Sequence, residues 1–296
     1  MPRDVTPPVH QRSTAWWLAT LRKRAERMHD ETLDLSRPIE WSSEAERTAA
    51  IAFFNAAYRA EESGLTQAHE LAADVERWDP ELAECLRLYG DEEGWHRQLL
   101  TQFLGYLGGD IRPMGRVTST FYSLYGRADR METIVLTNLM FETIGSTTYR
   151  LALRRATHPA MRQMLSILTR DESFHVPLNV HFLRQVLART KRSAMPRLRV
   201  IYHTLYVALI ASAYASRRRA LPFDKIPFTE LARAYAEHLG ALFLREPDLQ
   251  LRPSTLLLRA CGLRVDELMA GEGAAAVSLA AAEASADRQN VAVTAL

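Results

Sequence analysis

The chain has few cysteines and little excess of either charge. Of its 296 residues only Cys85 and Cys261 are cysteine, which argues against a disulfide framework and against a thiolate metal site. The 37 basic and 35 acidic side chains leave a net charge of +2, too small to favour a nucleic-acid partner. We therefore expect a protein of the reducing cytoplasm, and a nucleic-acid partner is not favoured.

The sequence also lacks long apolar runs. Its first residues, MPRDVTPPVHQR, contain no apolar stretch of the kind found in a signal peptide. The most apolar segment, residues 200–213, contains His203 and is shorter than a membrane span requires. Strand-type alternation of polar and apolar residues is missing as well. These absences favour an all-α protein and predict no membrane partner.

Two copies of one short pattern stand out against this background. They are Glu93-Gly-Trp-His96 and Glu172-Ser-Phe-His175. In each copy the carboxylate and the imidazole are three residues apart, so on a helix they share one face. Chance predicts fewer than one Glu-x-x-His pair in a chain of this composition, and three occur.

A single glutamate precedes each pattern. Glu61 lies 32 residues before Glu93, and Glu142 lies 30 residues before Glu172. The chain therefore reads Glu, Glu-x-x-His, Glu, Glu-x-x-His. Four-helix bundles use this arrangement to hold two iron or manganese ions in the core.

Helical periodicity places these side chains on buried faces. The helix that opens at Ser42-Ser43 has Glu61 in its apolar phase and Glu62 in its polar phase. Glu93 and His96 fall in the apolar stripe of the next predicted helix. Several carboxylates inside an apolar core repel one another and resist desolvation, and divalent ions remove that cost.

The alternative is a set of surface ion pairs or hydrogen-bonded core histidines. The third pair, Glu26-Arg-Met-His29, lies in a basic segment with no matching single glutamate, and we interpret it as a chance occurrence. His69 and His203 are left out of the site, because a lone histidine on such a face is more often a packed core residue.

The general pattern of dimetal sites assigns a role to each predicted ligand. Glu93 and Glu172 bridge the two metals, while Glu61 and Glu142 each bind one. An acid also precedes each motif, and histidine ligands usually donate their other N–H to a carboxylate. We expect Asp171 to orient His96 and Glu92 to orient His175, although Glu92 would otherwise be read as a solvated charge. The predicted catalytic and metal-binding residues are Glu61, Glu93, His96, Glu142, Glu172 and His175.

These residues resemble the ferritin-like di-iron carboxylate superfamily, especially its oxygen-activating members. The segments Ala60-Glu-Glu-Ser-Gly-Leu65, Asp91-Glu-Glu-Gly-Trp-His96 and Arg170-Asp-Glu-Ser-Phe-His175 look most like acyl-carrier-protein desaturases and p-aminobenzoate N-oxygenases. The resemblance covers about residues 45–190. It implies a ferritin-like four-helix bundle with additional N- and C-terminal helices, and two iron ions that activate O2, although manganese can occupy such sites.

Two positions depart from these relatives. The N-oxygenases have an extra histidine ligand where this chain has Leu168, which argues against N-oxygenation of their type. The desaturases have a threonine where this chain has Gly145, and Thr143, Ser146 and Thr147 are the nearby hydroxyls.

The resemblance implies a non-haem di-iron oxygenase, acting as a hydroxylase, a monooxygenase or a desaturase on a small-molecule or carrier-protein-bound substrate. A ferredoxin or flavoprotein would supply the electrons, and a homodimer is left open. One alternative is a bacterioferritin-like iron storage or ferroxidase protein, although the long C-terminal surplus argues against a compact storage unit. Another is a tRNA-modifying hydroxylase, in which Arg217-Arg218-Arg219 and Arg154-Arg155 would bind phosphate.

Three segments make up the predicted domain organisation. Residues 1–12 are expected to be disordered, and residues 271–296 form an Ala-rich tail that is disordered or frayed. Residues 13–270 form a single di-metal domain with a helical extension from about residue 192. The extension and the 108–130 connection are expected to supply a substrate pocket and a lid.

Overall fold

The computed structural model describes residues 12–113 and 130–270. Helices dominate these residues and no strand occurs among them, which confirms the all-α prediction. The predicted disorder of the first eleven residues and of the Ala-rich tail, and most of the expected lid, lie outside the described residues. The helices are α1 (Thr14–Arg27), α2 (Glu44–Val75), α3 (Pro80–Tyr106), α5 (Met131–Leu153), α6 (Pro159–Arg189), α7 (Met195–Asp224), α8 (Phe228–Arg245), α9 (Thr255–Ala260) and α10 (Val265–Ala270).

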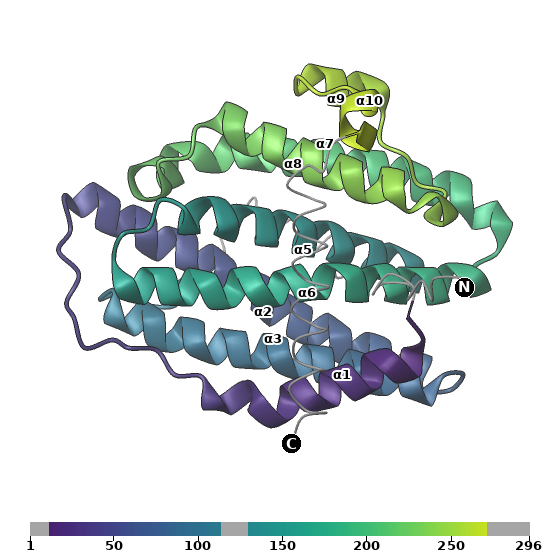
Figure 1. The fold of residues 1–296 in the computed structure, drawn as a ribbon, viewed down its shortest axis with the longest axis horizontal. Coiled ribbons are helices and arrows are strands. Elements are labelled where there is room, and N and C mark those ends of the chain that lie inside the picture. Colours follow the sequence, from purple (N-terminus) through teal and green to yellow (C-terminus); the bar gives the residue numbers. More distant parts are fainter. Residues whose placement is uncertain (1–11, 114–129, 271–296) are drawn as a thin grey trace, which may run out of the picture.

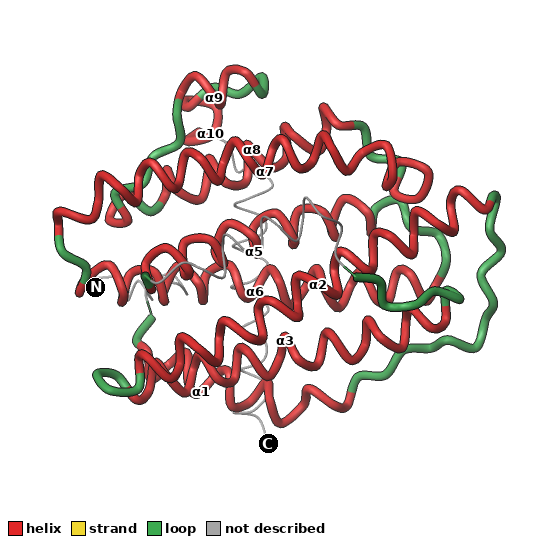
Figure 2. The backbone as a smooth tube through the Cα atoms, turned by 180° about the vertical axis from the view of Figure 1, so that it is seen from behind, coloured by secondary structure: helices red, strands yellow, loops and turns green. Residues whose placement is uncertain are grey.

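The four helices that carry the predicted ligands form two pairs. Helix α2 packs along α3, and α5 packs along α6. The pairs face each other through contacts of α3 with α6 and of α2 with α5. Helix α1 lies on the outer side of α3, and α7 and α8 form a further layer over α2 and α5 (Figures 1 and 2). The short helices α9 and α10 lie against α8 at the outside of that layer.

Local sequence signals set the ends of the first long helices. The Ser43 side chain caps α2 by accepting a hydrogen bond from the backbone N–H of Glu46, 3.1 Å away. The Glu46 carboxylate in turn accepts from the backbone N–H of Ser42. Asp79 caps α3, and the chain leaves that helix through Gly108, whose φ of +70° suits glycine.

Two apolar clusters fill the interior and leave a polar layer between them. One cluster contains the second half of α6 and residues such as Tyr89 and Met140. The other contains the first half of α6 and residues such as Tyr58 and Leu168. Each of the four ligand-bearing helices passes from one cluster to the other, and the predicted ligands lie where the helix crosses the middle of the core.

The C-terminal extension contains a break between two short helices. The structure has α9 and α10 with Gly262 between them at φ +74°. A left-handed residue cannot continue an α-helix, so the glycine divides the segment in two.

One stretch within the described residues, Arg192–Asp224, is long and apolar enough to cross a membrane by length and composition alone. It contains α7, which is longer than the predicted apolar segment and contacts α2, α5 and α8.

Candidate metal centre

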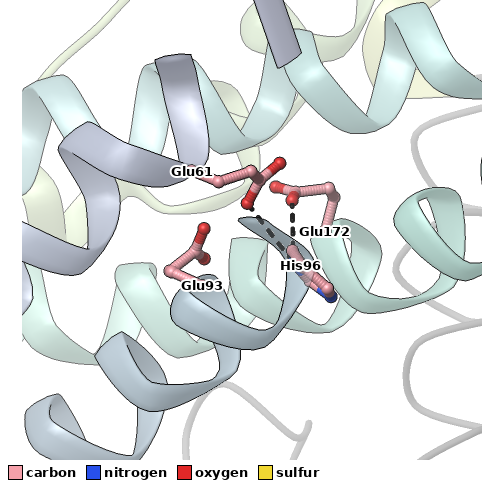
Figure 3. Close-up of side chains that lie close together, drawn as sticks. All are labelled: Glu61, Glu93, His96 and Glu172. Atoms are coloured by element: carbon pink, nitrogen blue, oxygen red, sulfur yellow. Dashed lines mark hydrogen bonds and ion pairs between the residues drawn. The ribbon is translucent and has the colours of Figure 1, made fainter. Parts of the chain in front are cut away.

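All six predicted ligands point into the polar layer. Their exposed fractions are 7% or less, and both histidines are fully buried. On α2 the structure places Glu61 inside, at 2% exposure, while Glu62 lies outside against Arg59. Figure 3 shows Glu61, Glu93, His96 and Glu172 turned toward one another from three different helices.

The ligand atoms fall into two groups that share two glutamates. Glu61 and His96 belong to the first group, Glu142 and His175 to the second, and Glu93 and Glu172 to both. Within each group the atoms lie within 4.8 Å of one another. Buried Glu/His groups of this kind could hold metal ions, and the two shared carboxylates are the ones that the sequence pattern assigned as bridges.

Each histidine turns Nδ1 toward the predicted glutamate ligands and Nε2 toward an acid that precedes a Glu-x-x-His motif. Nδ1 of His96 is 3.3 Å from Glu61 Oε2, and Nδ1 of His175 is 3.0 Å from Glu93 Oε1. Nε2 of His96 is 3.2 Å from Asp171 Oδ2. With the proton on Nε2, held by the carboxylate, the Nδ1 lone pair is available to a metal ion.

The second histidine repeats this arrangement from the other side. Nε2 of His175 is 3.3 Å from Glu92 Oε2, and Glu92 is buried at 6% exposure. Glu92 is therefore not a solvated charge. Both acids that precede the Glu-x-x-His motifs contact the histidine of the opposite motif, as the sequence predicted.

The sequence did not identify the residue that joins the two acids. Arg24, on α1, donates from Nη2 to Asp171 Oδ1 at 2.8 Å and also forms a short contact with Glu92 Oε1. Its side chain is only 8% exposed, and its guanidinium lies 4.1 Å from the centre of the Phe174 ring. One cation from outside the four ligand-bearing helices therefore holds both histidine-orienting carboxylates.

These contacts shift the pKa values of the acids and the histidines. Burial would raise the pKa of Glu92, but Arg24 and His175 outweigh it and lower that pKa to about 2. Burial would lower the pKa of His96, but hydrogen bonds with Asp171 and Glu61 outweigh it and raise that pKa to about 10. Burial would raise the pKa of Asp171, but Arg24, His96 and Arg170 together outweigh it and hold that pKa well below its usual range.

The pKa values of the two shared glutamates, Glu93 and Glu172, shift in the opposite direction from those of Glu92 and Asp171. Burial, followed by repulsion from neighbouring carboxylates, raises the pKa values of Glu93 and Glu172 well above the usual range. Without a metal ion each of these carboxyl groups binds a proton more tightly than an exposed glutamate does. A divalent cation would take the place of those protons.

Unpaired polar atoms give a direct test of whether metal ions fit here. Glu93 Oε1, Glu142 Oε2, Glu172 Oε1 and His175 Nδ1 are buried, and no group meets them with hydrogen-bond geometry, although His175 Nδ1 and Glu93 Oε1 lie 3.0 Å apart. Buried polar atoms normally have partners. Three carboxylate oxygens and one imidazole nitrogen are donors that divalent transition metals accept, so the residues present could hold a metal ion.

Two tyrosines contact Glu61 and Glu142, the two predicted ligands that are not shared between the groups. The Tyr89 hydroxyl donates a short hydrogen bond to Glu142, and the Tyr149 hydroxyl lies 3.5 Å from Glu61 Oε1. Both side chains are buried. They were not predicted, because an apolar-phase tyrosine is indistinguishable by periodicity from a packing residue.

Glycines leave room beside the two shared carboxylates. A Cβ at Gly64 would lie 3.2 Å from Glu93 Oε2, whereas one at Gly145 would lie 3.7 Å from Glu172 Oε2. Each glycine is three residues after a predicted ligand, Glu61 or Glu142. Close packing at Gly64 gives a structural reason for glycine there.

The residues left out of the predicted site lie away from it. Glu26 and His29 are exposed, His69 pairs with Asp91 at the surface, and His203 bonds to the Arg199 carbonyl. The hydroxyls of Thr143, Ser146 and Thr147 bond to backbone carbonyls of α5.

Two of the five arginines of the predicted phosphate patch are engaged in other contacts. Arg217 is 8% exposed and donates to Asp224 at 2.7 Å, and Arg155 donates to Glu230.

Comparison of the chain with known protein families, curated proteins and solved structures found no match in any of the three.

Proposed function

We propose that this chain is a non-haem di-iron oxygenase built on a ferritin-like four-helix bundle of α2, α3, α5 and α6. The observation that carries the proposal is the pair of ligand groups sharing Glu93 and Glu172. Two adjoining sets of carboxylate and imidazole donors, with two carboxylates in common, match the donor set of dimetal carboxylate proteins.

Iron bound there would supply the electrons that reduce O2 to an oxidant for one C–H bond of an organic substrate. The chain's own residues prepare the site. Asp171 and Glu92 hold the Nε2–H of the two histidines, which fixes the ring planes and keeps Nδ1 free to bind. Arg24 pairs with both acids and Arg170 pairs with Asp171 as well, while the two apolar clusters exclude water on either side.

The C-terminal helices favour an enzymatic function over iron storage. Helices α7 and α8 cover the ligand-bearing helices α2 and α5, and a compact iron-storage unit has no need of that layer. Size-exclusion chromatography with light scattering separates the two functions, because a storage protein would assemble into a many-subunit shell. An organic substrate, small or carrier-bound, and an external two-electron donor of the ferredoxin or flavoprotein class belong to this proposal.

Oxygen consumption by the iron-loaded chain tests it. With a chemical reductant and iron, the wild-type chain should consume O2, and Glu172→Ala should abolish the consumption while the circular-dichroism spectrum stays helical. Retention of the wild-type rate by the variant would overturn the proposal. Phe141→Ala, on the same helix as Glu142 but outside both ligand groups, is the control and should remain active.

A further inference from the structure

A basic cavity lies at one end of the helix pairs, away from the carboxylates. Its volume is about 610 Å³, within the range of small-molecule sites. Three parts of the chain line it: the turn between α2 and α3, the start of α5, and the connection from α6 to α7. Its polar and aromatic lining includes Trp78, Arg130, Glu132, Arg189, Lys191 and Arg197.

Positive charge dominates this cavity. Four cationic side chains face one acidic side chain, Glu132, which leaves a formal charge of +3. Arg130 approaches Glu132 only to 4.0 Å. Among the residues that the structure describes, neither Lys191 nor Arg197 forms an ion pair. Like charges gathered around one concavity raise its potential and attract a multivalent anion.

One of the cations is already positioned. The Arg189 guanidinium lies 4.1 Å from the centre of the Trp78 ring. Such stacking restricts the side chain and leaves the guanidinium N–H groups free to donate. A ligand would therefore meet at least one ordered donor and lose less conformational entropy on binding.

We propose that this cavity binds a small organic phosphate. A phosphomonoester carries a charge near −2 at neutral pH and several strong acceptor oxygens. It therefore matches a +3 lining of three guanidinium groups and one ammonium group better than a monocarboxylate does. Guanidinium groups bind phosphate in a bidentate manner.

The cavity is separate from the candidate metal centre. Arg130 and Glu142 are 12 residues apart at the start and middle of α5, a distance of about 18 Å along a helix. The inference therefore does not rest on the proposed oxygenase activity, and a failure of one leaves the other standing.

Calorimetric titration of the full-length chain with phenyl phosphate tests the inference. Benzoate and phenol are the comparison ligands, because they keep the ring and replace the phosphate with a single charge or none. Phenyl phosphate should bind at least tenfold more tightly than benzoate, and Arg197→Gln and Arg130→Gln should each weaken it at least tenfold. Arg192→Gln is the matched control, because Arg192 is exposed beside Lys191 but does not line the cavity. The affinity of this variant for phenyl phosphate should stay within twofold of wild type.

Two results would overturn the inference. One is phenyl phosphate binding no tighter than benzoate, and the other is an equal loss of affinity in Arg192→Gln and Arg197→Gln. Circular dichroism and thermal unfolding of each variant verify that it is folded.

The same phosphate chemistry could come from a lipid headgroup. Cosedimentation with phosphatidic acid vesicles that is lost in Arg197→Gln would assign the phosphate to a lipid. Binding of phenyl phosphate in the calorimetric titration, without cosedimentation of the chain with the vesicles, would assign the phosphate to a soluble compound.

Discussion

Arg24 donates a 2.8 Å hydrogen bond to Asp171, which lies 147 residues further along the chain. The same guanidinium contacts Glu92, so one side chain of α1 holds the two acids that orient the two candidate histidine ligands. This makes α1 part of the site, although it supplies no ligand.

Replacement of Arg24 by alanine should destabilise the fold strongly. It leaves the buried Glu92 carboxylate without its arginine partner, whereas Asp171 keeps an ion pair with Arg170 at 2.7 Å. Breaking a buried ion pair in this way costs about 3–5 kcal/mol. Arg22→Ala is the matched control on the same helix: its ion pair with Glu84 is largely exposed, and its loss should cost below about 1 kcal/mol. Urea unfolding measures both, and equal losses would show that Arg24 has no special role.

Metal binding should release protons. Glu93, Glu172, His96 and His175 all have raised pKa values in the metal-free chain, so each holds a proton to a higher pH than usual and a bound cation competes with that proton. Affinity should therefore fall as the pH falls. Titrating Mn2+ calorimetrically in two buffers of different ionisation enthalpy counts the protons released. A count near zero would mean that the cation binds elsewhere.

The two glycines beside the shared carboxylates should respond differently to alanine. The Cβ at Gly64 would press on Glu93 at 3.2 Å, whereas at Gly145 it would make an ordinary contact with Glu172 at 3.7 Å. Gly64→Ala should weaken metal affinity about tenfold, in the range of changes around a ligand. Gly145→Ala should leave affinity close to wild type, and both are helix positions where alanine is otherwise favourable. The reverse order would contradict the packing described here.

Two buried histidines should make the fold sensitive to acid. Burial lowers the pKa of His181 to about 4 and that of His238 to about 3. Above pH 6.5 both are neutral in the folded and unfolded chain, so they cause no pH dependence there. As the pH falls from 6.5 toward 4 the unfolded chain binds protons that the folded chain does not, and each histidine removes about 1.4 kcal/mol of stability per pH unit.

Replacing one of these histidines should flatten that decline. His238→Gln should reduce the slope of unfolding free energy against pH between 6.5 and 4 by about 1.4 kcal/mol per unit. His29→Gln, at an exposed position, is the control and should leave the slope unchanged. Parallel curves for wild type and His238→Gln would show that His238 is not buried in neutral form.

Periodicity was sufficient to find the residues that the four long helices turn inward. The phase of Glu61 against Glu62, and of each Glu-x-x-His pair, depends only on local helix geometry. The acids Glu92 and Asp171 were predicted because a ligand histidine needs an acceptor for its second N–H.

The partners contributed by tertiary packing could not be found in this way. Arg24 has the same sequence context as Arg22 and Lys23, and only the docking of α1 on α3 distinguishes the buried arginine from its exposed neighbour. Likewise, the break at Gly262 depends on a left-handed backbone conformation that a helical pattern does not reveal.

Metal content combined with anomalous diffraction tests the central claim most directly. The account predicts that the chain loaded anaerobically with Fe2+ binds two ions, one beside Glu61 and His96 and one beside Glu142 and His175, with Glu93 and Glu172 between them. Glu172→Ala should retain at most one. A single ion in the wild-type chain, or two ions bound away from these six residues, would contradict it.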